Sequence, residues 1–213
     1  MARALYAPCR YHSRLTLLPK AFTMKTISAI VLAGGRATRM QGRDKGLVPW
    51  RGQPLIEHVL SAVRPQVDEV VISCNRNAGI YARYAPCRND DIDGFPGPLA
   101  GIAACLPLCR QDWILVVACD MPCLPTDLAA KLLAGADGLP LAVAHDGEFL
   151  QPLALLFHRS LAASLDQALR EGVSSVQKWI RRQPHAVVHF EDPAAFININ
   201  ALEELTGNHD SPL

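Results

Sequence analysis

Residues 27–45 read ISAIVLAGGRATRMQGRDK, an apolar run followed by a glycine-rich, basic segment. The apolar run from Ile27 to Leu32 predicts a buried strand, which breaks at Gly34-Gly35. Glycine has no Cβ atom, so the backbone can come close to a ligand at these positions. Their N–H groups can point at anionic oxygens, while Arg39 and Lys45 neutralise the charge. The stretch therefore predicts a site for the phosphates of a nucleotide.

An ordinary turn followed by a solvated basic loop is the alternative for this stretch. A Gly-Gly pair after a strand is common and does not decide between the two. The spaced arginines and the Asp44-Lys45 pair favour the phosphate site. The glycine patterns of P-loops and of dinucleotide-binding turns are both absent from the sequence.

Composition and charge exclude several classes of protein. The chain has 213 residues, half of them hydrophobic, which suits one domain with a sizeable core. Residues 1–23 contain four basic residues and no acidic one, and the rest of the chain has 17 basic against 20 acidic residues, a charge of −3. A mildly acidic body argues against a broad nucleic-acid surface. The longest apolar runs of residues 1–23 are far shorter than a membrane span. From the charge and from these short runs, we expect neither a nucleic-acid nor a membrane partner.

Seven cysteines, an odd number with no CxxC pair, do not form a disulfide framework. No histidines accompany them in a zinc-binding pattern. We expect buried free thiols in a reducing cytoplasm.

The chain divides into three parts. Residues 1–23 are expected to be a basic extension, either disordered or produced by an upstream start, because Met24 lies three residues before the first strand. A targeting peptide is the alternative for this part. Residues 24–207 are predicted to form one domain, and residues 208–213 a polar tail.

Apolar strands alternate with helical patterns along the first two thirds of the chain. Besides the first strand, we predict strands at 69–73, 87–89 and 113–118, and helices that include 99–108 and 125–136. This alternation predicts an α/β fold, a doubly wound and mostly parallel sheet with helices on both faces. Ligands of such sheets bind beyond the carboxyl ends of the strands, where we expect Gly34, Asn75 and Asp120.

The second half alternates less strictly. Residues 139–144 and 152–157 flank a predicted hairpin turn, helices are predicted near 160–170 and 174–182, and 186–190 is a predicted strand. Residues 196–200 alternate apolar and polar side chains, which would place Asn198 and Asn200 on one face and the hydrophobic residues on the other. These amides either bind the backbone, or contact a second substrate or a metal-bound water.

Asp120 is the strongest single candidate for catalysis. A carboxylate directly after a hydrophobic strand lies at the rim of a core of low dielectric constant. Mg²⁺ prefers one or two carboxylates together with phosphate oxygens, so this single aspartate is enough to anchor it. The alternative is the N-cap of the next helix. Pro122 and Pro125 delay that helix and favour the metal role.

Other polar residues are harder to assign. Asp90 could bind a ribose or base, support the metal, or only solvate a loop. The seven histidines are scattered, and no spacing in the sequence compels a nucleophile and base array.

Four motifs together resemble the molybdenum cofactor guanylyltransferases. They are LAGG-x-x-x-RM-x-G-x-DK at Leu32–Lys45, PGPLAG at Pro96–Gly101, CDMP at Cys119–Pro122 and FININ at Phe196–Asn200. Each motif alone could belong to nucleotidyltransferases in general, but all four in this order are specific. The resemblance covers about residues 24–207.

This resemblance implies a Rossmann-like nucleotidyltransferase that joins GMP, from GTP, to molybdopterin carrying molybdenum, with Mg²⁺ and release of pyrophosphate. It assigns roles residue by residue. Three residues would be catalytic: Arg39, Lys45 and Asp120, the last as the metal ligand. The nucleotide side would comprise Leu32, Ala33, Gly34, Gly35, Lys45, Asp90 and Asp120, with either Ser73 or Asn75 toward guanine. The molybdopterin side would comprise Arg39, Gly97, Gly101, Asn198 and Asn200.

The implied chemistry agrees with the residues. The phosphate of molybdopterin is itself a nucleophile, so no catalytic serine, cysteine or histidine is needed. The rivals are transfer from CTP to the same cofactor, a sugar-phosphate acceptor, and a regulator without catalysis. We expect a cytoplasmic monomer that acts on small molecules and makes at most transient contact with cofactor-synthesis or acceptor proteins.

Overall fold

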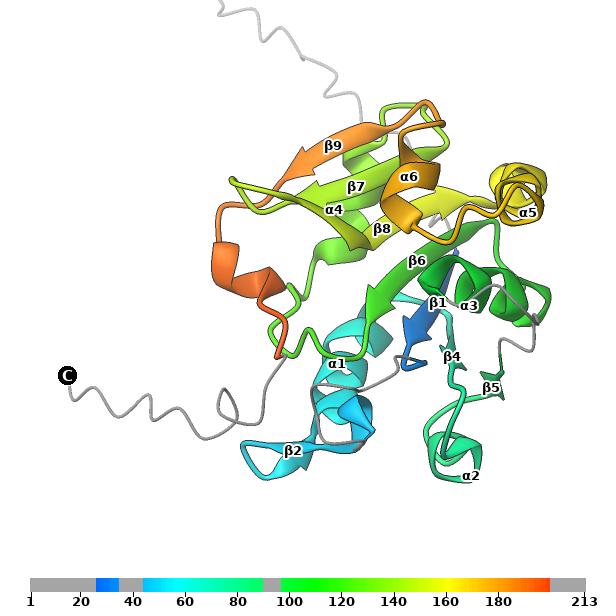
Figure 1. The fold of residues 1–213 in the computed structure, drawn as a ribbon. Helices are drawn as coiled ribbons and strands as arrows, with labels where there is room; N and C mark the ends of the chain where they lie inside the picture. Colours follow the sequence, from blue (N-terminus) through cyan, green and yellow to red (C-terminus); the bar gives the residue numbers. More distant parts are fainter. Residues whose placement is uncertain (1–25, 35–43, 90–96, 200–213) are drawn as a thin grey trace, which may run out of the picture.

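The structure is a computed structural model that describes residues 26–34, 44–89 and 97–199 (Figure 1). Its main sheet has seven strands. In chain order these are β1 (Ile27–Leu32), β4 (Glu69–Ser73), β5 (Cys87–Arg88), β6 (Trp113–Ala118), β7 (Leu141–His145), β8 (Leu150–His158) and β9 (Ala186–His189). A small hairpin of β2 (Pro49–Trp50) and β3 (Gln53–Pro54) stands apart from this sheet.

The order of the strands is β5-β4-β1-β6-β8-β7-β9. The pairs of β1 with β4 and β6, of β4 with β5, and of β7 with β9 are parallel. Strand β8 alone is antiparallel to both of its neighbours. Every strand except β8 therefore runs the same way, which confirms the predicted mostly parallel α/β sheet, including the hairpin between β7 and β8.

Six α-helices and five short 3₁₀ helices connect the strands in the described part of the chain. The α-helices are α1 (Leu55–Val63), α2 (Ala78–Tyr81), α3 (Pro98–Cys105), α4 (Leu128–Gly135), α5 (Ala162–Arg170) and α6 (Val176–Ile180). The 3₁₀ helices are η2 (Lys45–Leu47), η3 (Arg64–Gln66), η4 (Leu106–Leu108), η5 (Arg159–Leu161) and η6 (Pro193–Phe196).

The hydrophobic core forms two layers, one on each face of the sheet. Alternate residues of β1 divide between them: Ala29 and Val31 face one layer, and Ile30 and Leu32 the other. Helices α1, α2 and α4 contribute to the first layer, and α3, α5 and α6 to the second, with α3 and α6 in front of the sheet in Figure 1. Because β1 is buried along its whole length, its sequence is apolar apart from Ser28.

Helix α4 begins three residues later than its sequence pattern predicts. It starts at Leu128, and the side chain of Asp127 caps no backbone N–H group. Instead, Oε1 of Gln66 accepts a hydrogen bond of 2.8 Å from the N–H of Ala129, while its Nε2 donates to the carbonyl of Pro125. A tertiary contact from η3 thus sets this helix end.

The period-two interpretation of residues 196–200 is wrong. Phe196 ends η6, and residues 197–199, the last that the structure describes, lie outside any strand. Ile197 is 53% exposed although Ile199, two positions later, is buried, so the hydrophobic residues do not share a face. Phe196 packs edge-on against Phe190, with ring centroids 5.2 Å apart, and this contact holds the segment against the first core layer.

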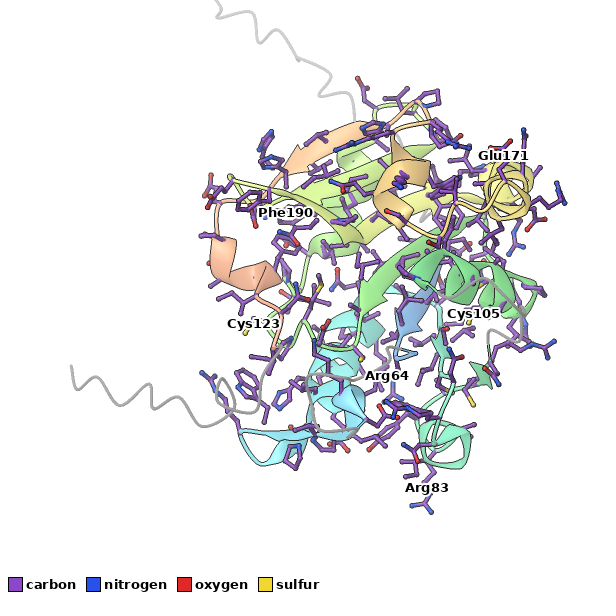
Figure 2. All side chains as sticks on the ribbon, in the orientation of Figure 1. Arg64, Arg83, Cys105, Cys123, Glu171 and Phe190 are labelled. Atoms are coloured by element: carbon purple, nitrogen blue, oxygen red, sulfur yellow. The ribbon has the colours of Figure 1, made fainter. Side chains whose placement is uncertain are left out.

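The cysteines of the described ranges carry free thiols. Cys74, Cys105, Cys109 and Cys119 are buried as expected, but Cys87 is only half-buried and Cys123 is exposed (Figure 2). Among the described residues, no helix is both long enough and apolar enough to cross a membrane.

Candidate nucleotidyl-transfer site

Three neighbouring strands end in the same row at one edge of the sheet. Leu32 at the end of β1 lies opposite Ser73 of β4 and Ala118 of β6. Two positions beyond this row come Gly34, Asn75 and Asp120, one after each strand. Asn75 and Asp120, which follow Gly34 by 41 and 86 positions in the sequence, thus lie with it at one edge of the sheet. This confirms the predicted edge.

Backbone hydrogen bonds continue the sheet just past the ends of the strands. The N–H of Ala33 donates to the carbonyl of Ser73 at 2.7 Å, and the N–H of Cys119 donates to the carbonyl of Leu32 at 3.0 Å. The side-chain amide of Asn75 lies 3.5 Å from the carbonyl oxygen of Gly34. A Cβ atom on Gly34 would come within 3.2 Å of that amide nitrogen. The glycine therefore lets two turns pass closely at the edge.

Lys45 and Asp120 form an ion pair across this edge. The Nζ atom of Lys45, the first residue of η2, donates to Oδ2 of Asp120. The side chains are 21% and 16% exposed, so both charges are partly withdrawn from water. The cation and carboxylate singled out from the sequence are therefore in direct contact.

The second carboxylate oxygen of Asp120 has no hydrogen-bond partner among the residues that the structure describes. Oδ1 is buried and accepts no hydrogen bond from the described residues. An unpaired buried oxygen of a charged group costs free energy, and native proteins seldom leave one without a reason. A hard cation such as Mg²⁺ would bind this oxygen, so the residue fits the metal role. Helix α4 starts eight residues after Asp120, which rules out the alternative as its N-cap.

Cys119 lies next to this pair but is not a nucleophile. Its thiol is buried, and burial together with the nearby carboxylates of Asp120 and Asp44 raises its pKa far above the usual range. The thiol therefore stays protonated at neutral pH.

Ser73 and Gly101 meet inside the protein, at the contact between β4 and α3. Ser73 is 2% exposed and Gly101 is buried. A Cβ atom on Gly101 would lie 2.5 Å from Oγ of Ser73 and 3.2 Å from a methyl group of Leu32. The glycine thus lets α3 pack closely on the strands that carry the site.

Replacing Gly101 with alanine is expected to lower the free energy of unfolding by about 1–3 kcal/mol, the usual cost of overpacking a tight core. Urea unfolding would measure the change. Gly79→Ala is the matched control, because Gly79 lies in α2 and a Cβ atom there meets nothing within 4 Å. That variant should keep or slightly raise stability. Equal losses in the two variants would refute the close contact at Gly101.

Two further residues predicted for the molybdopterin side lie near the same edge. Gly97 precedes α3 with φ of 155°, and a Cβ atom there would come within 2.9 Å of the carbonyl oxygen of Ser174. Asn198 is partly exposed, and the N–H of its neighbour Ile199 donates to the backbone carbonyl of Asp120 at 3.0 Å. The C-terminal segment is therefore attached directly to the loop that carries the carboxylate.

The ends of β7 and β9 bring two histidines together that the sequence did not connect. The rings of His145 and His189 lie with centroids 4.6 Å apart at the same edge of the sheet. The adjoining hairpin turn is fixed by Asp146, whose carboxylate accepts hydrogen bonds from the N–H groups of Phe149 and Glu148. These bonds, that of Phe149 foremost, lower the pKa of Asp146. No signal in the sequence pairs the two histidines, because only the parallel register of β7 and β9 does so.

Four of the predicted site residues lie outside the described ranges: Gly35, Arg39, Asp90 and Asn200. Their roles remain predictions, as do the ligand contacts assigned to the others.

Comparison with known proteins identifies the family. The profile described as MobA-like NTP transferase domain matches residues 29–187. A protein of Shewanella amazonensis named molybdenum cofactor guanylyltransferase is 46% identical over 183 residues, which cover 84% of this chain and 93% of that protein. The chain belongs to the molybdenum cofactor guanylyltransferase family. A protein of the same name from Shewanella putrefaciens is 44% identical over 182 residues, with the same coverage of both chains.

Solved structures agree with this family assignment. The crystal structure of molybdopterin-guanine dinucleotide biosynthesis protein A from Archaeoglobus fulgidus superimposes with a TM-score of 0.67 at 25% identity, over 84% of this chain and 94% of that one. A nucleotidyl transferase from Methanothermobacter shares the fold, with a TM-score of 0.69 at 21% identity, over 84% and 94% of the two chains. This member of the guanylyltransferase family is thus a nucleotidyltransferase with a Rossmann-like sheet.

Proposed function

We propose that this enzyme transfers GMP from GTP to the phosphate of molybdopterin that carries molybdenum, and releases pyrophosphate. One observation carries the proposal: Lys45 contacts Asp120 at the sheet edge beside Gly34, and one buried oxygen of Asp120 has no partner in the described part of the chain. A cation for phosphates and an anion for a metal are what nucleotidyl transfer requires. The names of the relatives supply guanine and the molybdenum cofactor.

The nucleotide would lie over the ends of β1 and β6. The backbone N–H groups after β1 would bind the phosphates, and the ammonium of Lys45 would neutralise their charge. Lys45 already has an anionic partner in Asp120, so a bound phosphate would share the ammonium with that carboxylate. Asn75 lies beside Gly34 and remains the candidate for a contact with guanine.

Asp120 would hold Mg²⁺ through its unpartnered oxygen. When bound, the metal supplies positive charge to the phosphate oxygens of the nucleotide. The described chain offers this ion a single well-placed carboxylate, which suits a cation that takes most other ligands from phosphate and water.

The reaction needs no protein nucleophile. A phosphate oxygen of molybdopterin forms a bond to the α-phosphorus of GTP, and the bond from that phosphorus to the bridging oxygen breaks. Pyrophosphate leaves with the electron pair. Lys45 stabilises the negative charge that grows on the phosphates, a contribution that depends on its position. We place the acceptor at Gly97 and Asn198, with Arg39 and Asn200. Gly101, predicted for the same side, is buried and would act only by letting α3 pack closely on β4.

Incubation with molybdopterin, molybdate and GTP is expected to give the guanylylated cofactor and one pyrophosphate per turnover. Parallel reactions with CTP and ATP, and a thermal-shift titration with each nucleotide and Mg²⁺, test the base. GTP should raise the unfolding temperature most, because a ligand that binds only the folded state stabilises it. A clear preference for CTP would overturn the guanylyl assignment, and transfer to a sugar phosphate would overturn the acceptor. The cytoplasmic location stays a prediction.

A further inference from the structure

Asp44, the residue before Lys45, is held by a segment from elsewhere in the chain. Its Oδ1 accepts a hydrogen bond of 2.5 Å from the hydroxyl of Tyr81, and its Oδ2 accepts one of 2.9 Å from the side-chain amide of Asn77. Its backbone carbonyl accepts from the N–H of Leu47, which closes the turn of η2. Both oxygens of the carboxylate therefore have partners that α2 and its first flanking residue provide.

Tyr81 is suited to hold this carboxylate. Its side chain is completely buried in the core layer that also contains helices α1 and α4. Burial, then the neighbouring Cys119 and the hydrogen-bonded Asp44 carboxylate, raise the pKa of its phenol far above the usual range. The hydroxyl therefore stays protonated at neutral pH and donates to Asp44.

Tyr81 also contacts the residue on the other side of Lys45. A Cβ atom on Gly46 would lie only 2.5 Å from the Tyr81 hydroxyl and 3.3 Å from the sulfur of Cys119. No positive φ requires glycine at this position, so the reason for it is space. The phenol therefore touches both neighbours of Lys45 in the sequence, one by a hydrogen bond and one by close packing.

We propose that Tyr81 is a positioning residue for Lys45. It fixes Asp44 and Gly46, and through them the backbone from which the Lys45 side chain reaches Asp120. A lysine has several freely rotating bonds, and ordering them costs entropy each time the ammonium meets a phosphate. Fixing the backbone from which the side chain extends limits the positions that the ammonium can reach, and this reduces the entropy cost before the nucleotide binds. The consequence for catalysis rests on the function proposed above, whereas the consequence for the order of Lys45 does not.

The test uses Tyr81→Phe in the full-length protein, with Tyr84→Phe as the matched control. The hydroxyl of Tyr84 donates a hydrogen bond of 2.8 Å to the carboxylate of Glu57, so the control removes the same group from another tyrosine–carboxylate pair. The first readout is the rate at which an acylating reagent labels the amine of Lys45 in the absence of nucleotide, measured by mass spectrometry relative to Lys131. Tyr81→Phe should raise the relative rate severalfold, and Tyr84→Phe should leave it unchanged.

The second readout is a double-mutant cycle with Lys45→Met, measured as the dissociation constant for GTP. Tyr81→Phe should weaken binding by up to about tenfold when Lys45 is present, and should have little further effect in Lys45→Met. A purely structural role predicts the same loss in both backgrounds. Urea unfolding of each variant is the control for folding, and a cooperative transition would show that the variant is folded.

These readouts separate the two proposals. Unchanged labelling of Lys45 in Tyr81→Phe, or equal losses of affinity in the two backgrounds, would overturn the positioning role. If the wild-type enzyme transferred CMP and not GMP, the guanylyl proposal would fail, while the labelling rate would still decide the role of Tyr81.

Discussion

Replacing Asp120 with alanine is expected to abolish Mg²⁺-dependent pyrophosphate release, with a rate at least about 10³-fold lower. The substitution removes the partner of Lys45 and the buried oxygen that suits the metal. The fold should survive, since the backbone carbonyl of residue 120 still accepts from Ile199 and the following turn leads into α4 unchanged. Release from GTP is measured with a coupled pyrophosphate assay, and folding by circular dichroism.

The matched control for this experiment is Asp127→Ala. Asp127 is also an aspartate between β6 and α4, but its side chain is 52% exposed and pairs with Lys131 one helical turn away. An exposed ion pair of this kind contributes little to the free energy of unfolding, so the activity and stability of Asp127→Ala should stay close to those of the wild type. Wild-type release from the Asp120→Ala protein would show that this carboxylate is not the metal ligand.

Replacing Lys45 with methionine is expected to lower kcat/KM for GTP by about 100-fold or more. Methionine keeps much of the apolar stem and removes the ammonium, so the phosphates lose a charge-assisted contact. Asp120 loses its ion-pair partner as well, and the site becomes more negative where an anion must bind. Steady-state kinetics over a range of GTP concentrations gives the change.

Two further variants sharpen this result. Lys45→Arg restores the charge but not the shape, and should recover only part of the activity, because a planar guanidinium does not replace a compact ammonium in a confined site. Lys131→Met removes an exposed lysine of α4 and should leave kcat/KM unchanged. Full activity of the Lys45→Met enzyme would remove Lys45 from the nucleotide site.

The position of the candidate site could be predicted from the sequence because three neighbouring strands are mostly apolar. Each buried strand is followed at once by polar or small residues, so its end is visible in the sequence. Parallel pairing then places Gly34, Asn75 and Asp120 in one row. The roles proposed for Lys45 and Asp120 rest on their residue types and on their contact at this edge.

The contacts that hold the site could not be predicted in the same way. Tyr81 lies in a four-residue helix whose pattern is too short to show which face is buried. Its hydrogen bond to Asp44 spans 37 positions and depends on how α2 packs against η2. The predicted alternation at residues 196–200 was wrong for a related reason. Phe196 and Ile199 are buried by tertiary contacts, and neither belongs to a strand.

Strand β8, the antiparallel one, gives the sheet two parts with different freedom to vary. On one side of it lie the parallel strands β1, β4, β5 and β6, joined by helical crossovers, and the segments after them carry Gly34, Lys45 and Asp120. An insertion in this part is expected to shift the strands relative to one another. On the other side, β7 and β8 are joined by a short hairpin whose turn projects from the same edge, with Phe149 62% exposed at its end. A hairpin turn can lengthen or change without disturbing the strands that it joins. Changes in this turn should therefore leave the packing of the parallel strands that lead to Gly34 and Asp120 intact.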